Sequence, residues 1–306
     1  MEPLTGDQPT TATSGPLASA LLDVIRDALA VHGPLEGLDP ATYARGHAAF
    51  EACSDQRRRI IAFLSERLAA RGTERDVRVL SVGCGDGSVD AAVADSLLSD
   101  RFRAVRYVGV EPFAGSAASF RSLMSELPMS ELPMSELDEP RLETHVHVAT
   151  FEQALAEGLA DERFDVVTFV HSMYYVPDVA TTVRAAHRLL RPGGELLVLS
   201  APRGVLNHLA GALAPSIDGH HQWFSDDVAR GMAEAGFDPT PLTTLDARVD
   251  LTEADRDVLD FTVQATLTDE VLPLVTAYLA EVALTPDTLV VPHPVDVYHV
   301  AGDRRR

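Results

Sequence analysis

The chain of 306 residues carries a formal net charge of −21, from 46 acidic and 25 basic residues. A surplus of this size repels phosphate backbones, so nucleic acid is disfavoured as a substrate and a neutral or cationic small molecule is the easier partner. The two cysteines are too few for a disulfide framework, and no apolar run approaches the roughly 18 residues of a membrane span. We therefore expect a soluble, cytoplasmic protein that binds neither nucleic acid nor membrane, with its oligomeric state left open.

The first part of the chain is polar and is followed by two helical patterns. Residues 1–16 are rich in Thr, Ser, Gly and Pro and have no apolar core, which predicts a disordered leader rather than a signal peptide. Leu and Ile then recur at helical spacing over residues 17–31, and again over 41–71 with a break near Cys53 to Asp55.

From residue 77 onward, strand and helix patterns alternate. Such alternation with short connections predicts an α/β fold, a doubly wound and mostly parallel sheet with helices on both faces. The segment Arg191-Pro-Gly-Gly194 predicts a turn that stops a helix. We expect strands at 77–82, 106–110, 143–148, 164–170, 194–200, near 240–247 and at 294–300, and helices at 88–98, 115–126, 151–159, 179–190, 226–235 and 252–282.

One internal repeat is present, a Ser-Glu-Leu-Pro-Met pattern between Ser125 and Leu137. Its prolines, five residues apart, forbid a regular helix. Because the repeat lies between a predicted helix and a predicted strand, we expect a surface insertion, with partner binding as the alternative.

The most informative segment is Val79-Leu-Ser-Val-Gly83-Cys-Gly85-Asp-Gly87, followed by Tyr107-Val-Gly-Val-Glu111. An apolar strand opens onto a turn with three alternate glycines, where a ligand can approach the backbone closely. The next strand ends in a carboxylate, which can accept hydrogen bonds from both hydroxyls of a ribose. The two segments together predict a site for an adenosine-containing cofactor.

The spacing within the loop indicates which cofactor. It reads G-x-G-x-G rather than the G-x-G-x-x-G of dinucleotide folds, and a lysine-containing phosphate loop is impossible because the chain has no lysine. Negative charges on Asp86 and Asp90, in and after the loop, would repel a pyrophosphate but suit a cationic sulfonium. The predicted cofactor is S-adenosylmethionine, with S-adenosylhomocysteine as its product.

These segments, with Phe164-Asp165-Val-Val and Leu190-Arg-Pro-Gly-Gly-Glu-Leu, resemble class I S-adenosylmethionine-dependent methyltransferases over roughly residues 75–202. Finer features are similar to the histamine N-methyltransferase group: Glu111-Pro112, the segment from Val170 to Asp178, and Leu259-Asp-Phe261. The resemblance implies a Rossmann-like methyltransferase fold of seven strands, the last one antiparallel, with a helical lid over the substrate. It also implies one domain over 17–306, comprising N-terminal helices (17–74), a cofactor-binding core (75–202) and a C-terminal part (203–306) with lid helices at 252–282.

The same resemblance implies two sets of site residues. The cofactor would be lined by Gly83, Gly85, Gly87, Glu111, Pro112, Ser116, Thr150, Phe151, Val170 and His171. The substrate would face Tyr43, Phe50, Asp55, His171, Tyr174 and Tyr175. Four positions depart from the group: His171 replaces a glutamine, Asp55 a longer glutamate, and Val205 and Leu209 two tryptophans, so histamine itself is not the expected substrate.

Methyl transfer from a sulfonium is an in-line displacement, so the main task of an enzyme is to hold a lone pair opposite the sulfur in a dry pocket. His171 follows a strand end and is the candidate base, with a histidine bonded to backbone as the alternative. Asp55 would pair with a cationic substrate or orient His171, or else serve as a helix cap or solvated residue. Tyr174 and Tyr175 are substrate contacts or core aromatics; as consecutive residues they should point in different directions.

His220-His221 and Trp223 invite a metal interpretation, but adjacent histidines without a matching acidic or cysteine partner rarely chelate, and we expect no metal. We expect Trp223 to pack at the lip of the site and Ser225 to cap the helix that follows.

The sequence thus predicts an S-adenosylmethionine-dependent methyltransferase (EC 2.1.1 class) that acts on a nitrogen atom of a small amine or azole. The alternatives are O- or C-methylation of a specialised metabolite, with His171 taking the proton of a hydroxyl, and a catalytically silent cofactor-binding subunit.

Overall fold

The computed structural model describes residues 15–71, 76–99, 102, 104–127, 142–213 and 223–303. The chain divides into two compact units. The sheet unit comprises residues 57–200, 221–243 and 296–306, and the helical unit comprises residues 1–56, 201–220 and 244–295. The leader predicted over 1–16 falls outside the described residues up to residue 14, and the helix after it begins at Pro16.

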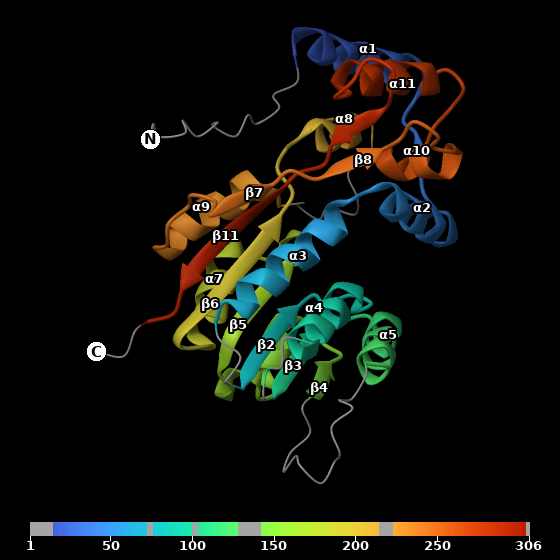
Figure 1. Ribbon diagram of the computed structural model, residues 1–306. Coiled ribbons are helices and arrows are strands. Elements are labelled where there is room, and N and C mark those ends of the chain that lie inside the picture. Colours follow the sequence, from blue (N-terminus) through green and yellow to red (C-terminus); the bar gives the residue numbers. More distant parts are fainter. Residues whose placement is uncertain are drawn as a thin grey trace, which may run out of the picture. The chain divides into compact units, whose positions relative to one another are not determined.

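A seven-stranded sheet forms the centre of the sheet unit, in the order β4-β3-β2-β5-β6-β11-β7 (Figure 1). Strands β4, β3, β2, β5 and β6 are parallel neighbours, and β11 pairs antiparallel with β6. The predicted α/β fold with an antiparallel last strand is therefore confirmed. The strands are β2 (Val77–Val82), β3 (Val105–Val110), β4 (Leu142–His147), β5 (Phe164–Val170), β6 (Leu190–Ser200), β7 (Thr243–Leu245) and β11 (Val295–Ala301).

Helices cover both faces of this sheet because its central strands are apolar on both sides. On β3, Val108 and Val110 face a core shared with three helices, α6 (Phe151–Ala156), α7 (Val179–Arg188) and α9 (Ser225–Ala235). Tyr107, which points to the opposite face, donates to Asp90 of α4 (Ser88–Ser99) at 2.8 Å. The Tyr107 ring also packs on Phe120 of α5 (Ala114–Ser125).

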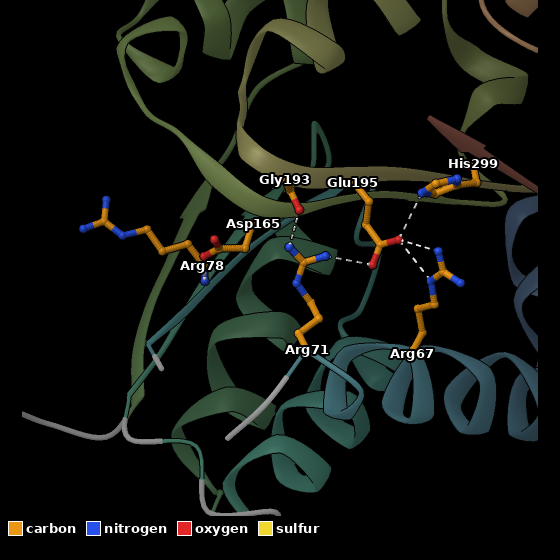
Figure 2. Close-up of polar contacts among 7 residues, drawn as sticks. All are labelled: Arg67, Arg71, Arg78, Asp165, Gly193, Glu195 and His299. Atoms are coloured by element: carbon orange, nitrogen blue, oxygen red, sulfur yellow. Dashed lines mark hydrogen bonds and ion pairs between the residues drawn. The ribbon is translucent and has the colours of Figure 1, made fainter. Parts of the chain in front are cut away.

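A buried carboxylate fastens α3 (Gln56–Ala69) and the turn after it to the sheet (Figure 2). Glu195 of β6 accepts from Nε and Nη2 of Arg67 at 3.0 and 2.9 Å and from Nη1 of Arg71 at 3.1 Å. Nε2 of His299 on β11 lies 3.3 Å from the same carboxylate. Burial opposes ionisation of Glu195, but the hydrogen bonds from His299 and Arg67 and the charges of Arg67 and Arg71 outweigh it and lower its pKa to about 2.

The predicted Arg191-Pro-Gly-Gly194 turn lies inside β6 as a bulge. Strand β6 pairs with β5 at Leu190 and again from Glu195, so the four residues between them stand opposite Asp165 alone. Gly193 supplies the left-handed backbone that this bulge needs, with φ of +78°. The helix before it ends at Arg188.

The helical unit has its own apolar core, formed mainly by helices and closed by two short antiparallel strand pairs. Helices α2 and α10 approach each other closely at Gly46 of α2, where an added Cβ would lie 2.7 Å from the carbonyl oxygen of Asp257 in α10. The helices are α1 (Pro16–His32), α2 (Pro40–Cys53), α8 (Val205–Leu213), α10 (Arg256–Val263) and α11 (Leu272–Val282), and the strand pairs are β1 (Glu36–Gly37) with β9 (Ala265–Thr266) and β8 (Arg248–Asp250) with β10 (Val290–Pro292).

The helical stretch expected over 252–282 is divided: Gln264 adopts φ of +60° and ends α10, and α11 begins at Leu272. Helix α8 and the β8–β10 pair were not predicted, since each is short and β8 has a charged residue on either side of Val249. Ser225 does not cap α9; the Asp227 carboxylate accepts from the Phe224 N–H at 3.0 Å instead.

Two features discussed from the sequence lie outside the described residues: His220-His221 and the repeat from Pro128 onward. Within the ranges given above, no helix combines the length and apolar character needed to cross a bilayer.

Candidate functional site

The glycine loop follows β2 directly and is pinned to β3. The N–H groups of Gly83 and Cys84 both donate to the carbonyl oxygen of Val110, at 2.8 and 3.2 Å. Gly83, Gly85 and Gly87 have φ of +69°, +56° and +80°. All three glycines therefore occupy left-handed backbone, which strains any other residue.

The surroundings of the three glycines differ. A Cβ on Gly83 would lie 2.3 Å from Cβ of Ser172, and one on Gly87 would lie 2.7 Å from Cδ2 of Phe120. A Cβ on Gly85 would meet no atom within 4 Å. Gly83 and Gly87 are needed for packing, whereas Gly85 presents bare backbone to open space, as close approach of a ligand requires.

Glu111, the first residue after β3, is held against this loop. Its side chain is buried, and its two oxygens accept from the N–H groups of Gly85 at 3.0 Å and Phe113 at 2.9 Å. The Glu111 N–H donates to the carbonyl oxygen of His147, at the end of β4. Each carboxylate oxygen keeps acceptor capacity beyond its backbone bond, so the group can receive two further hydrogen bonds.

The other predicted cofactor residues surround the same edge of the sheet, each in its own local role. Pro112 is exposed and Ser116 half-buried, on the turn into α5 and in its first turn. Thr150 caps α6 by accepting from the Gln153 N–H at 3.3 Å. Phe151 is buried with its ring 5.7 Å from that of Phe169, and Val170 is the half-buried last residue of β5.

The charge pattern of the loop differs from the expectation. Asp86 is exposed and accepts from the Ser88 N–H at 3.0 Å. Asp90 is buried beneath the loop on Tyr107, and desolvation, only partly offset by its hydrogen bonds, raises its pKa to about 6. Of the two aspartates predicted to place negative charge at the loop, only Asp86 is exposed there, and Asp90 is part of the core. Burial also raises the pKa of the Cys84 thiol, which makes it a poor nucleophile.

His171 follows β5 at the same edge, in a left-handed backbone with φ of +50° that is uncommon for histidine. Its N–H donates to the carbonyl oxygen of Leu199, and its Nδ1 lies 2.7 Å from the Tyr174 hydroxyl. The next residue, Ser172, donates from Oγ to the carbonyl oxygen of Val82 at 2.5 Å. Ser172, which sequence reasoning missed, joins the His171 loop to the strand that carries the glycines; only its place beside a strand end signals it.

The two consecutive tyrosines diverge, as expected. The rings of Tyr174 and Tyr175 meet edge to face with centroids 6.3 Å apart. Tyr174 is half-buried on His171, whereas Tyr175 is 80% exposed.

The remaining predicted substrate residues belong to the helical unit. Tyr43 is 42% exposed and packs edge-on against Phe261, and Phe50 is a core residue on the same ring. Asp55 directly precedes α3, and its Oδ1 accepts from the Arg248 N–H at 2.7 Å across to β8. The predicted pair of catalytic residues, His171 and Asp55, is therefore divided between the two units. Among the residues that the structure covers, no cluster of three His, Cys, Asp or Glu side chains could hold a metal ion.

Comparison with known proteins gives a family match. The model of a methyltransferase domain matches residues 47–242 of this chain. A ubiquinone biosynthesis O-methyltransferase from Pseudomonas aeruginosa (strain UCBPP-PA14) is 30% identical over 146 residues, 47% of this chain and 50% of that protein. The chain spans about half the length of the curated relatives it matches.

Solved structures of similar arrangement were also found. The mycolic acid cyclopropane synthase CmaA1, complexed with SAH and CTAB, has a TM-score of 0.46 and 16% identity, over 79% of this chain and 83% of that one. The YcgJ protein from Bacillus subtilis has a TM-score of 0.48 and 13% identity, over 79% and 98%.

Proposed function

We propose that this chain, which belongs to the methyltransferase domain family, transfers a methyl group from S-adenosylmethionine to an oxygen atom of a small molecule. Its membership in that family confirms the expectation of a class I S-adenosylmethionine-dependent methyltransferase. The finer resemblance to histamine N-methyltransferases has no support from the sequence relative named above, which is an O-methyltransferase by name.

One observation carries the proposal, the junction of the Gly85 backbone with the Glu111 carboxylate. The Gly85 N–H orients the carboxylate, and open space above Gly85 leaves room for a nucleoside beside it. Glu111 would accept from the ribose hydroxyls, as a carboxylate at this strand end does in nucleoside sites. When bound, the cofactor supplies an electrophilic methyl group on a sulfonium.

The loop after β5 favours oxygen as the acceptor. If Nδ1 of His171 carries the proton and donates to the Tyr174 oxygen, Nε2, which is buried in the structure, holds the lone pair that would take a proton from a hydroxyl brought against it. The acceptor oxygen then bonds to the methyl carbon, the carbon–sulfur electron pair stays on sulfur, and the hydroxyl proton ends on His171. A neutral imidazole nitrogen would need no such base, whereas a hydroxyl or a protonated amine would. The His171–Tyr174 pair therefore favours a hydroxyl over an azole, and the O-methyltransferase relative favours a hydroxyl over an amine.

Nitrogen methylation, the leading expectation from sequence, depends on Asp55 as a site for a cationic substrate. One oxygen of the Asp55 carboxylate accepts a hydrogen bond from the Arg248 N–H, which is a structural role for this side chain. The assignment of Asp55, Tyr43 and Phe50 to substrate binding stays a prediction. So do the single domain over 17–306, the lid at 252–282 and the cytoplasmic location.

A direct test is incubation of the purified chain with isotopically labelled S-adenosylmethionine and two matched sets of acceptors, phenols and catechols against primary amines and imidazoles. We expect label on oxygen of the hydroxylated set, lost in Glu111→Ala. Label only on the nitrogen set would overturn the choice of oxygen. Tight binding of S-adenosylhomocysteine without turnover of either set would indicate a silent cofactor-binding subunit.

A further inference from the structure

The loop that carries His171 and Tyr174 is held at both ends. At its start, Ser172 is bonded to β2 through the carbonyl oxygen of Val82. At its end, the carbonyl oxygen of Val176 accepts from Nε1 of Trp223 at 2.8 Å. An indole has one hydrogen-bond donor and no acceptor, so this contact uses the whole polar capacity of the Trp223 side chain.

The short helix between these ends transmits the constraint. Helix η3 (Met173–Tyr175) is a single turn with Met173 buried beneath it. The N–H groups of Tyr175 and Val176 donate back to the carbonyl oxygens of Ser172 and Met173. Because Val176 directly follows η3, a hydrogen bond to its carbonyl oxygen restrains the end of this turn, and with it the direction of the Tyr174 hydroxyl toward His171.

Trp223 itself stands on a rigid support. Ser225, two residues later, donates from Oγ to the Asp296 carboxylate at 2.5 Å and lies 2.7 Å from the Tyr298 hydroxyl. That hydroxyl is buried and donates to the carbonyl oxygen of Ser225 at 2.8 Å. Both partners belong to β11, so the start of α9 is tied to the central sheet and the Trp223 donor is held in place.

We propose that Trp223 is a positioning residue for the loop that carries His171 and Tyr174. Its indole N–H holds the carbonyl group of Val176, and through η3 this contact keeps the Tyr174 hydroxyl aligned on His171. This inference rests on the proposed function, since alignment matters only if His171 takes a proton. The half-buried indole also packs against the core of the sheet unit. The positioning role differs from this packing role because it depends on the single N–H group of the indole.

The chain has one tryptophan, so biosynthetic replacement of tryptophan by β-(3-benzothienyl)alanine changes residue 223 alone. The analogue keeps the shape of the indole and lacks the N–H. We expect kcat to fall about tenfold, the scale of one lost hydrogen bond, with KM and Kd for S-adenosylmethionine within twofold. Phe237→Ala is the matched control, since it removes packing on His187 at the far end of α7 and α9. It should lower the melting temperature and leave kcat unchanged.

A second readout does not depend on turnover. 5-Fluorotryptophan gives a single ¹⁹F resonance, which Tyr174→Phe should shift or broaden if the loop couples the two residues. Tyr278→Phe, which removes a hydroxyl bonded to Val205 in the helical unit, should leave it unmoved. An unmoved resonance in Tyr174→Phe, or an unchanged kcat in the analogue, would overturn the positioning role. A shifted resonance in a protein that methylates no acceptor would leave the coupling intact and count against the proposed function instead.

Discussion

Gly83 and Gly85 share a left-handed backbone but have opposite surroundings, and this contrast divides the roles of the glycine loop at the scale of single residues. Gly83 is closed in by Ser172, whereas the position above Gly85 is open. The sequence motif treats the two glycines alike. In the structure Gly83 packs against Ser172, and we propose that the open position above Gly85 admits the cofactor.

Gly83→Ala and Gly85→Ala should therefore fail in different ways. We expect Gly83→Ala to lower the free energy of unfolding by roughly 3 kcal/mol, from a steric clash added to backbone strain. Gly85→Ala should lower it by only about 1 kcal/mol yet weaken S-adenosylhomocysteine binding, because its Cβ occupies the open space. Urea unfolding and calorimetry measure the two effects, and equal stability losses would contradict this division.

Glu111→Ala removes the acceptor at the centre of the site. We expect the Kd for S-adenosylhomocysteine to rise at least tenfold, since hydrogen bonds to a charged acceptor are each worth about 1.5–3 kcal/mol. Glu126→Ala, which removes an exposed carboxylate bonded only locally to Ser122, is the matched control and should bind as wild type does. Equal affinity in the two variants, measured by calorimetry, would remove Glu111 from the site.

Asp90 gives the molecule an unusual pH dependence. Its folded pKa of about 6 lies above the ordinary 3.8, so the folded state holds the proton more tightly. The resulting stabilisation is full below about pH 4 and is lost as the pH rises through 6. Asp90→Asn keeps an acceptor for Tyr107 without the charge, so at pH 8 it should be more stable than wild type by about 1–3 kcal/mol. A stability difference that does not change between pH 4 and pH 8 would refute this.

At the scale of elements, α3 combines an apolar stripe, with Ile60, Leu64 and Leu68 buried, and a cluster of charges that ties it to the sheet. Glu195 meets Arg67 and Arg71 from one end of the helix and His299 from β11 (Figure 2). A buried carboxylate with this many donors is well satisfied, but removing it leaves two guanidinium groups without their partner.

Glu195→Gln should lower the free energy of unfolding by about 3–5 kcal/mol at pH 7. Because the folded pKa is lowered to about 2 from the ordinary 4.5, the contribution is present above pH 4.5 and is lost as the pH falls toward 2. Glu143→Gln, in a more exposed ion pair with Arg106, is the control and should change stability by less than about 1 kcal/mol. Urea titrations at pH 7 and pH 3 test both; a loss of the same size at the two pH values would argue against a charge-based attachment.

At the scale of the whole molecule, the two units have separate cores, and every predicted cofactor residue lies in the sheet unit. Leu279 is fully buried in the helical unit, so a substitution there tests whether cofactor binding depends on the sheet unit alone. We expect Leu279→Ala to lower the free energy of unfolding by about 2–5 kcal/mol and to leave the Kd for S-adenosylhomocysteine within twofold. A large loss of affinity in the folded variant would show that the helical unit contributes to cofactor binding.

The sequence by itself determined the alternation of strands and helices from residue 77, the glycine loop and the carboxylate after the next strand. These are local signals, because hydrophobic period, turn chemistry and strand ends are read within a few residues of one another. It also indicated the place of His171, directly after a strand whose end lies on the same edge as the loop.

Only the tertiary structure decided the uses to which individual side chains are put. From the sequence Asp90 is interpreted as a charge at the loop, whereas in the structure it is buried and accepts from Tyr107. The role of Ser172 is visible only from its contact with Gly83. Trp223 and Val176 are 47 residues apart, so no local pattern could pair them. A hydrogen bond or a steric contact between distant segments depends on how their elements pack, and packing is a property of the assembled fold rather than of any stretch of sequence.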